Sequence, residues 1–101
     1  MTNWERYEEL KRTYKICRNI HAYVSKDFKK GTPEYDVAVN KALNEFDVVV
    51  SSVGVGYAHH KYSVIKNTPG LPAKDLAIIC DAGSLPFGFR VQDGLIYVHT
   101  D

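Results

Sequence analysis

Two apolar stripes with helical spacing occupy the first half of the chain. The first advances by alternating steps of three and four residues, which keeps its side chains on one face of a helix. Its members are Tyr7, Leu10, Tyr14, Cys17, His21, Val24 and Phe28. Thr2–Glu5 matches a capping box, and Lys29–Gly31 supplies cations and a glycine for the carboxyl end. The pattern predicts one helix from about residue 3 to residue 29.

A second helix is expected to begin at Thr32–Glu34, where an N-cap hydroxyl, a proline and a carboxylate follow one another. Its stripe consists of Tyr35, Val39, Ala42, Phe46, Val49 and Val53. Val48–Val50 alone is also typical of a strand, because β-branched residues favour sheets. Residues 48–53 therefore stay open to both interpretations, and the unbroken stripe followed by Gly54 favours a helix to about residue 53. The two helices predict an antiparallel hairpin.

The second half of the chain predicts strands. Residues 62–66 form a short candidate strand, and residues 76–80, the most apolar run, are expected to be a central strand. Asn67–Pro72 predicts a turn between them, because proline and glycine fix or free the backbone.

Asp93 and Gly94 lie between two strand-like runs, residues 87–92 and 95–100, and this arrangement is the strongest short signal for a hairpin. The apolar face of the hairpin then carries the pairs Val91–Ile96, Phe89–Val98 and Phe87–Thr100. The outer face carries the pairs Gln92–Leu95, Arg90–Tyr97 and Gly88–His99. All the elements together predict a single α+β domain over residues 1–101, with the N-terminal helical hairpin packed on one face of a sheet of three or four antiparallel strands.

Charge and cysteine content narrow the functional classes. The chain has 13 basic and 12 acidic side chains and a formal net charge of +1, which argues against a dedicated nucleic-acid binder. No apolar run approaches the ~20 residues of a membrane span, and charges occupy the start of the chain, so we expect a cytoplasmic protein without membrane contact. Cys17 and Cys80 lack a metal-binding spacing and are expected to be buried free thiols.

The sequence contains no motif for a cofactor or a metal ion, and it assigns no catalytic residue. Gly54–Gly56 lacks the third glycine of a dinucleotide fingerprint and is expected to be a flexible link. His59 and His60 are adjacent, so in an extended chain they point to opposite sides and do not easily share a metal ion. His59, His60, His99 and Asp81 are the residues on which a small hydrolase or nuclease would depend.

Two surfaces are candidates for binding. The first is the outer face of the sheet, where Arg and Tyr are residue types enriched at binding hot spots and a glycine allows close approach. Its residues are Arg90, Tyr97, His99 and Gly88, with Asp81 and Tyr62 as contributors. The second is a basic ridge on the first helix, which suits an acidic partner or a solvated face and consists of Lys11, Arg12, Lys15 and Arg18.

Three functional hypotheses follow. The first is a non-catalytic interaction protein that binds a protein partner, such as an inhibitor or adaptor of the small, neutral kind found in phages and mobile elements. A homodimer is also expected, because the two long helices carry more apolar surface than a few short strands cover. The alternatives are a binder of a small anionic ligand such as a nucleotide, using Arg90, Tyr97 and His99, and a His/Asp-dependent enzyme.

Overall fold

The computed structural model describes residues 1–56, 59–83 and 88–99, which form nine elements around one sheet. The helices are α1 (Asn3–Thr13), α2 (Ile20–Ser25), α3 (Pro33–Glu45) and α4 (Ala73–Cys80). The strands are β1 (Ile16–Cys17), β2 (Val48–Gly56), β3 (His59–Asn67), β4 (Phe89–Gln92) and β5 (Leu95–His99). The strand order is β1-β2-β3-β5-β4, in which β1 pairs parallel with β2 and the other pairs are antiparallel. The α+β class is confirmed, and the described sheet is mixed and five-stranded rather than antiparallel and smaller.

The helix predicted over residues 3–29 is wrong as a single element. Its start is confirmed, because Thr2 and Glu5 form a capping box. However, α1 ends at Thr13, and Tyr14 is extended with φ −126° and ψ 151°. Ile16 and Cys17 then pair with Val48 and Val49 before α2 begins. The backbone here joins the sheet, which hydrogen-bonds to it and buries Cys17.

The second predicted helix begins as expected and ends early. Thr32 caps α3 and Pro33 follows it. The helix ends at Glu45, and residues 48–53 belong to β2, so the strand interpretation holds for them. Val48 and Val50 pack into the core beside α4, whereas Val49 packs against α2 and α3. The valines therefore alternate between two cores, as strand residues do. Gly54–Gly56, expected as a flexible link, also lies within β2.

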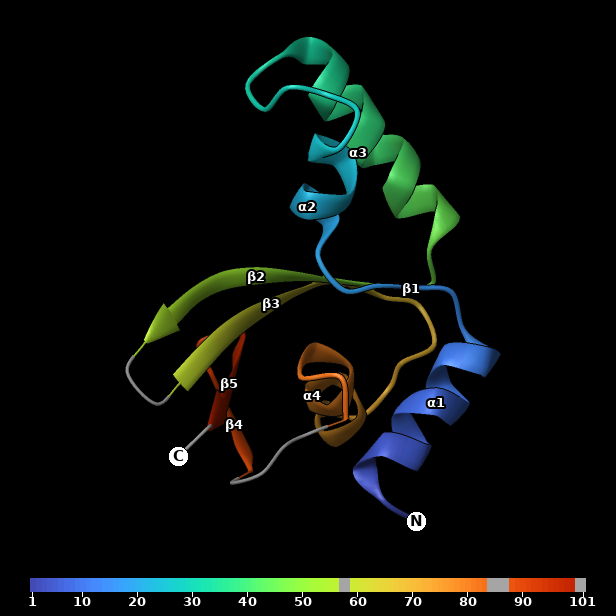
Figure 1. Cartoon of the computed structure of the whole chain (residues 1–101), viewed down its shortest axis with the longest axis vertical. Coiled ribbons are helices and arrows are strands. Elements are labelled where there is room, and N and C mark those ends of the chain that lie inside the picture. Colours follow the sequence, from blue (N-terminus) through green and yellow to red (C-terminus); the bar gives the residue numbers. More distant parts are fainter. Residues whose placement is uncertain (57–58, 84–87, 100–101) are drawn as a thin grey trace.

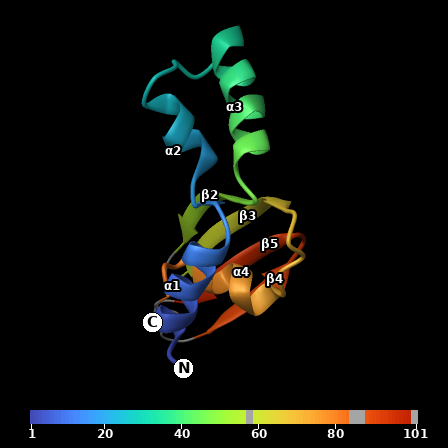
Figure 2. The same ribbon diagram turned by 90° about the vertical axis from the view of Figure 1, so that its right-hand side faces the viewer.

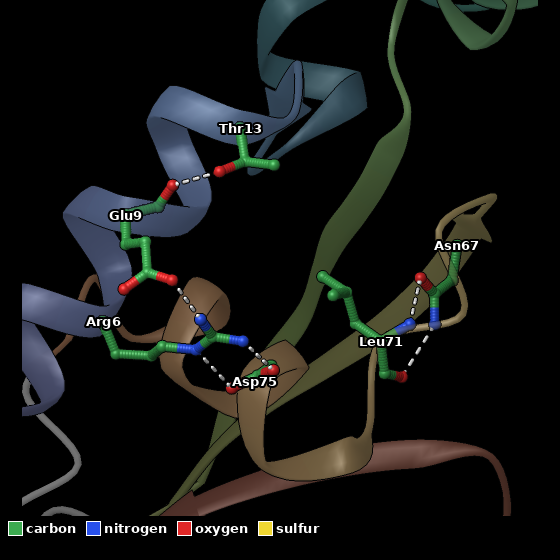
Figure 3. A network of polar contacts seen from close by, with 6 residues as sticks. All are labelled: Arg6, Glu9, Thr13, Asn67, Leu71 and Asp75. Atoms are coloured by element: carbon green, nitrogen blue, oxygen red, sulfur yellow. Dashed lines mark hydrogen bonds and ion pairs between the residues drawn. The ribbon is translucent and has the colours of Figure 1, made fainter.

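Residues 76–80 form the second half of α4, so the prediction of a central strand is wrong. All the residues from Asp75 to Cys80 are buried, because α4 packs against α1 on one side and β4 and β5 on another. Residues 76–80 of the enclosed helix are all apolar, so this run alone shows no helical alternation of apolar and polar residues. The turn expected over Asn67–Pro72 is confirmed, and Asn67 clamps it with two hydrogen bonds to the backbone of Leu71, both 3.0 Å long (Figure 3).

The hairpin of β4 and β5 has the predicted register. Phe89 pairs with Val98, Arg90 with Tyr97, Val91 with Ile96 and Gln92 with Leu95. The Phe87–Thr100 pair lies outside the described residues. Ile96 and Val98 are buried as predicted, but α4 and α1 cover them in place of the N-terminal helical hairpin. Val91, predicted on the same face, is 53% exposed because it lies on the edge strand β4.

The helices divide between the two faces of the sheet (Figures 1 and 2). One core holds Leu10 of α1, the apolar side of α4, and residues of β2 and β5. A bidentate ion pair joins these two helices, with Arg6 Nη2 2.8 Å and Arg6 Nε 3.2 Å from the carboxylate oxygens of Asp75 (Figure 3). On the other face α2 and α3 stand over β1 and the adjoining end of β2, where Val49 joins a second core.

Cys17 and Cys80 are both free and buried, as expected. Burial raises the pKa of the Cys80 thiol to about 12, because the surrounding core solvates a thiolate poorly. Burial also raises the pKa of Cys17. Both thiols therefore stay protonated at neutral pH and act as small apolar core side chains.

Candidate functional site

The side chains of β5 alternate between a covered and an open face of the sheet. Ile96 and Val98 pack into the core with α4, so Leu95, Tyr97 and His99 point to the opposite face. We call this opposite face, over β3, β5, β4 and the adjoining part of β2, the open face. In the described part of the chain, α2 and α3 stand on that side only at the β1 end of the sheet (Figure 1).

One row of residues crosses the open face at Tyr97. Strand pairing places Gly54 beside Lys61, Lys61 beside Tyr97, and Tyr97 beside Arg90. Arg90 Cζ lies 4.7 Å from the centroid of the Tyr97 ring, and Lys61 Nζ lies 5.8 Å from it. We call these four residues the tyrosine row. It places an aromatic ring between two cations.

A second row lies next to the tyrosine row and carries two histidines. Gly56 pairs with His59, and His59 pairs with His99. Gly88 continues this histidine row, because the His99 backbone N–H donates a 3.0 Å hydrogen bond to its carbonyl oxygen. The two imidazole rings meet edge to face with their centroids 4.7 Å apart. The row therefore offers a compact aromatic cluster beside Tyr97.

A third row on the other side of Tyr97 is uncharged and carries Ser51, Ser63, Leu95 and Gln92. The three rows together contain the cations Lys61 and Arg90 and no acidic residue. Among the residues that the structure describes, nothing lies within 4 Å of a Cβ atom built on Gly54 or Gly88. The open face is thus a locally positive platform with an aromatic centre.

This arrangement suits a ligand that has both a planar ring and a negative charge. The Tyr97 ring lies between the two cations, and the planar guanidinium of Arg90 over it can stack against a ligand ring and is a bidentate donor that matches phosphate or carboxylate geometry. Lys61 adds a second positive charge on the other side of the ring. Ser63 and Gln92 of the third row add hydrogen-bond donors and acceptors, whereas Ser51 is buried.

Four of the six residues predicted for this surface come together, namely Arg90, Tyr97, His99 and Gly88. Tyr62 and Asp81 do not join them. Tyr62 pairs with Ile96 and packs against the core, so it points to the covered face. Burial raises the pKa of Tyr62, and the charge of Asp81 raises it further. Asp81 caps the carboxyl end of α4, the helix that packs on the covered face.

The sequence analysis missed Lys61, His59 and Gly54 as members of this surface. It expected a strand only over residues 62–66, whereas β3 spans His59–Asn67. The alternation of His59, Lys61 and Ser63 on one side of that strand is the signal that could have found them. Their position beside Tyr97 depends on pairing between β3 and β5, which no local pattern specifies.

The predicted basic ridge is not one helical face. Lys11 and Arg12 lie on α1, Lys15 follows its end, and Arg18 lies beyond β1. The Arg18 guanidinium donates to the carbonyl oxygens of Ile79 (3.0 Å) and Cys80 (2.9 Å) at the carboxyl end of α4. Arg18 is therefore committed to capping a helix, and the ridge breaks because the chain turns into the sheet after α1.

The residues proposed for an enzyme are divided between the faces of the sheet. His59 and His99 meet on the open face, whereas His60 stacks at 6.4 Å on Tyr62 of the covered face. Over the described ranges, no group of three or more His, Cys, Asp or Glu residues is arranged to hold a metal ion. General acid–base catalysis would require His59, His60, His99 and Asp81 to converge at one site, and the structure does not bring all four together. His21, on the predicted apolar stripe, is instead exposed and hydrogen-bonded through Nδ1 to the Tyr35 hydroxyl at 2.8 Å.

A groove of about 600 Å³ runs between α2 and α3, on a part of the molecule separate from the open face. Apolar side chains that line it are unusually exposed, at 44% for Tyr23, 42% for Phe28 and 68% for Val37. Charged residues of both signs, including Lys41 and Glu34, border it. It is the second surface of the chain that offers contact area to a partner.

No described helix has both the length and the apolar character needed to cross a bilayer. Comparison with models of protein families, with curated proteins and with solved structures finds no match for this chain.

Proposed function

We propose that the protein is a non-catalytic binding protein whose open face takes a small anionic ligand with a planar ring, such as a nucleotide. The tyrosine row carries this proposal, because it sets one aromatic ring between Lys61 and Arg90 with no acidic residue in the three rows of the face. The ligand ring would stack on the Arg90 guanidinium, which lies over Tyr97 on its other side, and the phosphate would take hydrogen bonds from Lys61 or Arg90.

Two kinds of interaction would hold the ligand, and each contributes a few kcal/mol. Stacking of a base on an aromatic side chain contributes about 1–3 kcal/mol. A hydrogen bond to a charged group contributes about 1.5–3 kcal/mol. An Arg–Tyr contact across strands also exists in proteins without any ligand, so only binding itself distinguishes a site from a structural stack. Arg90 is exposed, and its removal therefore tests binding without disturbing the core.

Thermal unfolding in the presence of a panel of nucleoside monophosphates tests the proposal. A ligand that binds only the folded state raises stability by about 2.7 kcal/mol at a concentration of 100 times its Kd. We expect a saturable rise in Tm with at least one nucleotide, which Arg90→Gln and Lys61→Gln each weaken. Arg12→Gln on α1 is the matched control and should leave the rise unchanged. No rise across the panel, or an equal rise in Arg90→Gln, contradicts the proposal.

Binding of a protein is the second candidate function, and the exposed apolar side chains of the α2–α3 groove favour it. The occupant we propose is a second copy of the chain, since two such hairpins could bury Tyr23, Phe28 and Val37 against each other. Sedimentation then gives the mass of a dimer, and Val37→Lys gives that of a monomer. A monomeric mass for the unchanged protein at high concentration removes this candidate.

A further inference from the structure

We infer that the open face binds two successive nucleotides of a single-stranded nucleic acid, one base on the tyrosine row and the next on the histidine row. The inference rests on the proposed function and specifies its ligand. It follows from the spacing of the two aromatic rows, from the open edges of the platform and from the local balance of charge.

The spacing of the rows favours a single strand over a duplex. Tyr97 and His99 are two residues apart on β5, and a strand advances about 3.4 Å per residue, so the two rows are about 6.8 Å apart. Stacked bases in a duplex are only about 3.4 Å apart. Two bases that each lie on their own row are therefore unstacked from one another. Only a strand whose bases can splay out meets that condition.

The edges of the platform favour a chain over a free mononucleotide. Small-molecule sites are usually concave and bury most of their ligand. Here the tyrosine row ends at Gly54 and the histidine row ends at Gly88, and a Cβ on either glycine meets nothing within 4 Å. No residue that the structure describes walls in a small ligand at these two positions, and a polymer can continue past both. The aromatic area is also shared between two rows, which a single base cannot cover.

The charge on the open face is compatible with a phosphate backbone although the whole chain is nearly neutral. Lys61 and Arg90 flank Tyr97, and the three rows carry no opposing carboxylate. Neutrality of the chain predicts weak binding to nucleic acid in general, whereas this local field acts within the ~10 Å over which charges remain unscreened at moderate salt. Two phosphate contacts predict a slope of log K against log salt of about −1.4 for a single strand.

Competition binding with a fluorescently labelled oligothymidylate tests the inference. Unlabelled competitors are thymidine monophosphate, the thymidine dinucleotide, an oligouridylate and a duplex of the same length. We expect the dinucleotide to bind roughly 5- to 150-fold more tightly than the monophosphate, the range that one added stacked base gives. The single strands should also compete more strongly than the duplex. Whether oligothymidylate or oligouridylate competes more strongly shows whether the face prefers deoxyribose or ribose, and either result supports a single-stranded ligand.

Variants separate the two rows. His99→Val keeps a strand-forming side chain, and it should abolish the gain of the dinucleotide while leaving the monophosphate unaffected. Tyr97→Leu should weaken binding of both the monophosphate and the dinucleotide. Arg90→Gln should also weaken binding of both and reduce the slope of log K against log salt by about 0.7, so this variant tests the tyrosine row if Tyr97→Leu fails to fold. Arg12→Gln on α1 is the control for loss of an exposed cation and should bind as the unchanged protein does.

The outcomes distinguish this inference from the proposed function. If the monophosphate binds through Tyr97 but the dinucleotide binds no more tightly, the inference is overturned and the proposed function stands. Equal or tighter binding of the duplex also overturns the inference. If neither monophosphate nor oligonucleotide binds, both are overturned.

Discussion

Arg18 provides the sharpest test of whether a predicted binding residue is instead structural. Its guanidinium donates to the last carbonyl groups of α4, those of Ile79 and Cys80, and it also lies over the ring of Tyr7 at 5.9 Å. The carbonyl groups at the carboxyl end of a helix lack partners within the helix, and a cation there is favourable. Replacing Arg18 by methionine keeps apolar packing on Tyr7 and removes both donors.

The cost of Arg18→Met follows from these contacts. A hydrogen bond from a charged donor contributes about 1.5–3 kcal/mol when shielded from water and less when exposed. Arg18 is exposed along part of its length, so we take about 1 kcal/mol for each bond and about 2 kcal/mol in total. For a domain of this size, that loss lowers Tm by about 10 °C.

Thermal and urea unfolding followed by circular dichroism measures this loss. Arg12→Met is the matched control, because Arg12 is exposed on α1, and we expect it to change stability by less than about 0.5 kcal/mol. If both variants are equally stable, Arg18 does not stabilise the end of α4, and the reasoning from its hydrogen bonds is refuted.

Three further predictions concern the core. Asp75→Asn should lower Tm, because the ion pair with Arg6 is bidentate and the Asp75 side chain is only 10% exposed. A double-mutant cycle with Arg6→Met should show that the two losses of stability are coupled, and additive losses contradict this. Burial raises the pKa of Cys80 from 9.0 to about 12, so the unfolded state loses the thiol proton first as the pH rises. The free energy of unfolding should therefore fall between these two pH values by up to about 1.4 kcal/mol per pH unit, and an equally steep fall in Cys80→Ala argues against this source. Gly83→Ala should destabilise more than Gly94→Ala, because both have positive φ but a Cβ at Gly83 lies 2.9 Å from the backbone of α1; equal melting temperatures for the two refute the clash.

Helix starts and the hairpin turn could be predicted from the sequence, whereas the pairing between distant segments could not. The capping box at Thr2, the start of α3 at Thr32 and the hairpin at Asp93 each depend on a few neighbouring residues, and all three are confirmed. The break after α1 depends on β2, because Ile16 and Cys17 leave the helix to pair with valines more than thirty residues away. No helical or strand period reveals such a partner.

Two apolar runs are ambiguous in the sequence for a related reason. Val48–Val50 is a strand and residues 76–80 a helix, yet both are buried on every side and lack a period that would separate the two structures. Length and β-branching were the remaining criteria. They favour a strand for the valines, as observed, and they do not exclude a helix for a run that contains Leu76 and Ala77.

The part of the candidate site that lies on the β4–β5 hairpin was predicted from the sequence, and the part on other strands was not. The facing of Arg90 and Tyr97 follows from the Asp-Gly turn and is confirmed. Lys61 and His59 come from β3, which pairs with β5 across an intervening helix in the sequence, so they were missed. The same long-range pairing turns Tyr62 away from the site by the alternation of strand side chains.

Nuclear magnetic resonance of the isotopically labelled protein, titrated with the thymidine dinucleotide, tests the central claim most directly. Our account predicts saturable changes in the amide resonances of the open face, at Lys61, Arg90, Tyr97 and His99, with little change along α2 and α3. Changes confined to the α2–α3 groove, or an unchanged spectrum at millimolar dinucleotide, would contradict it.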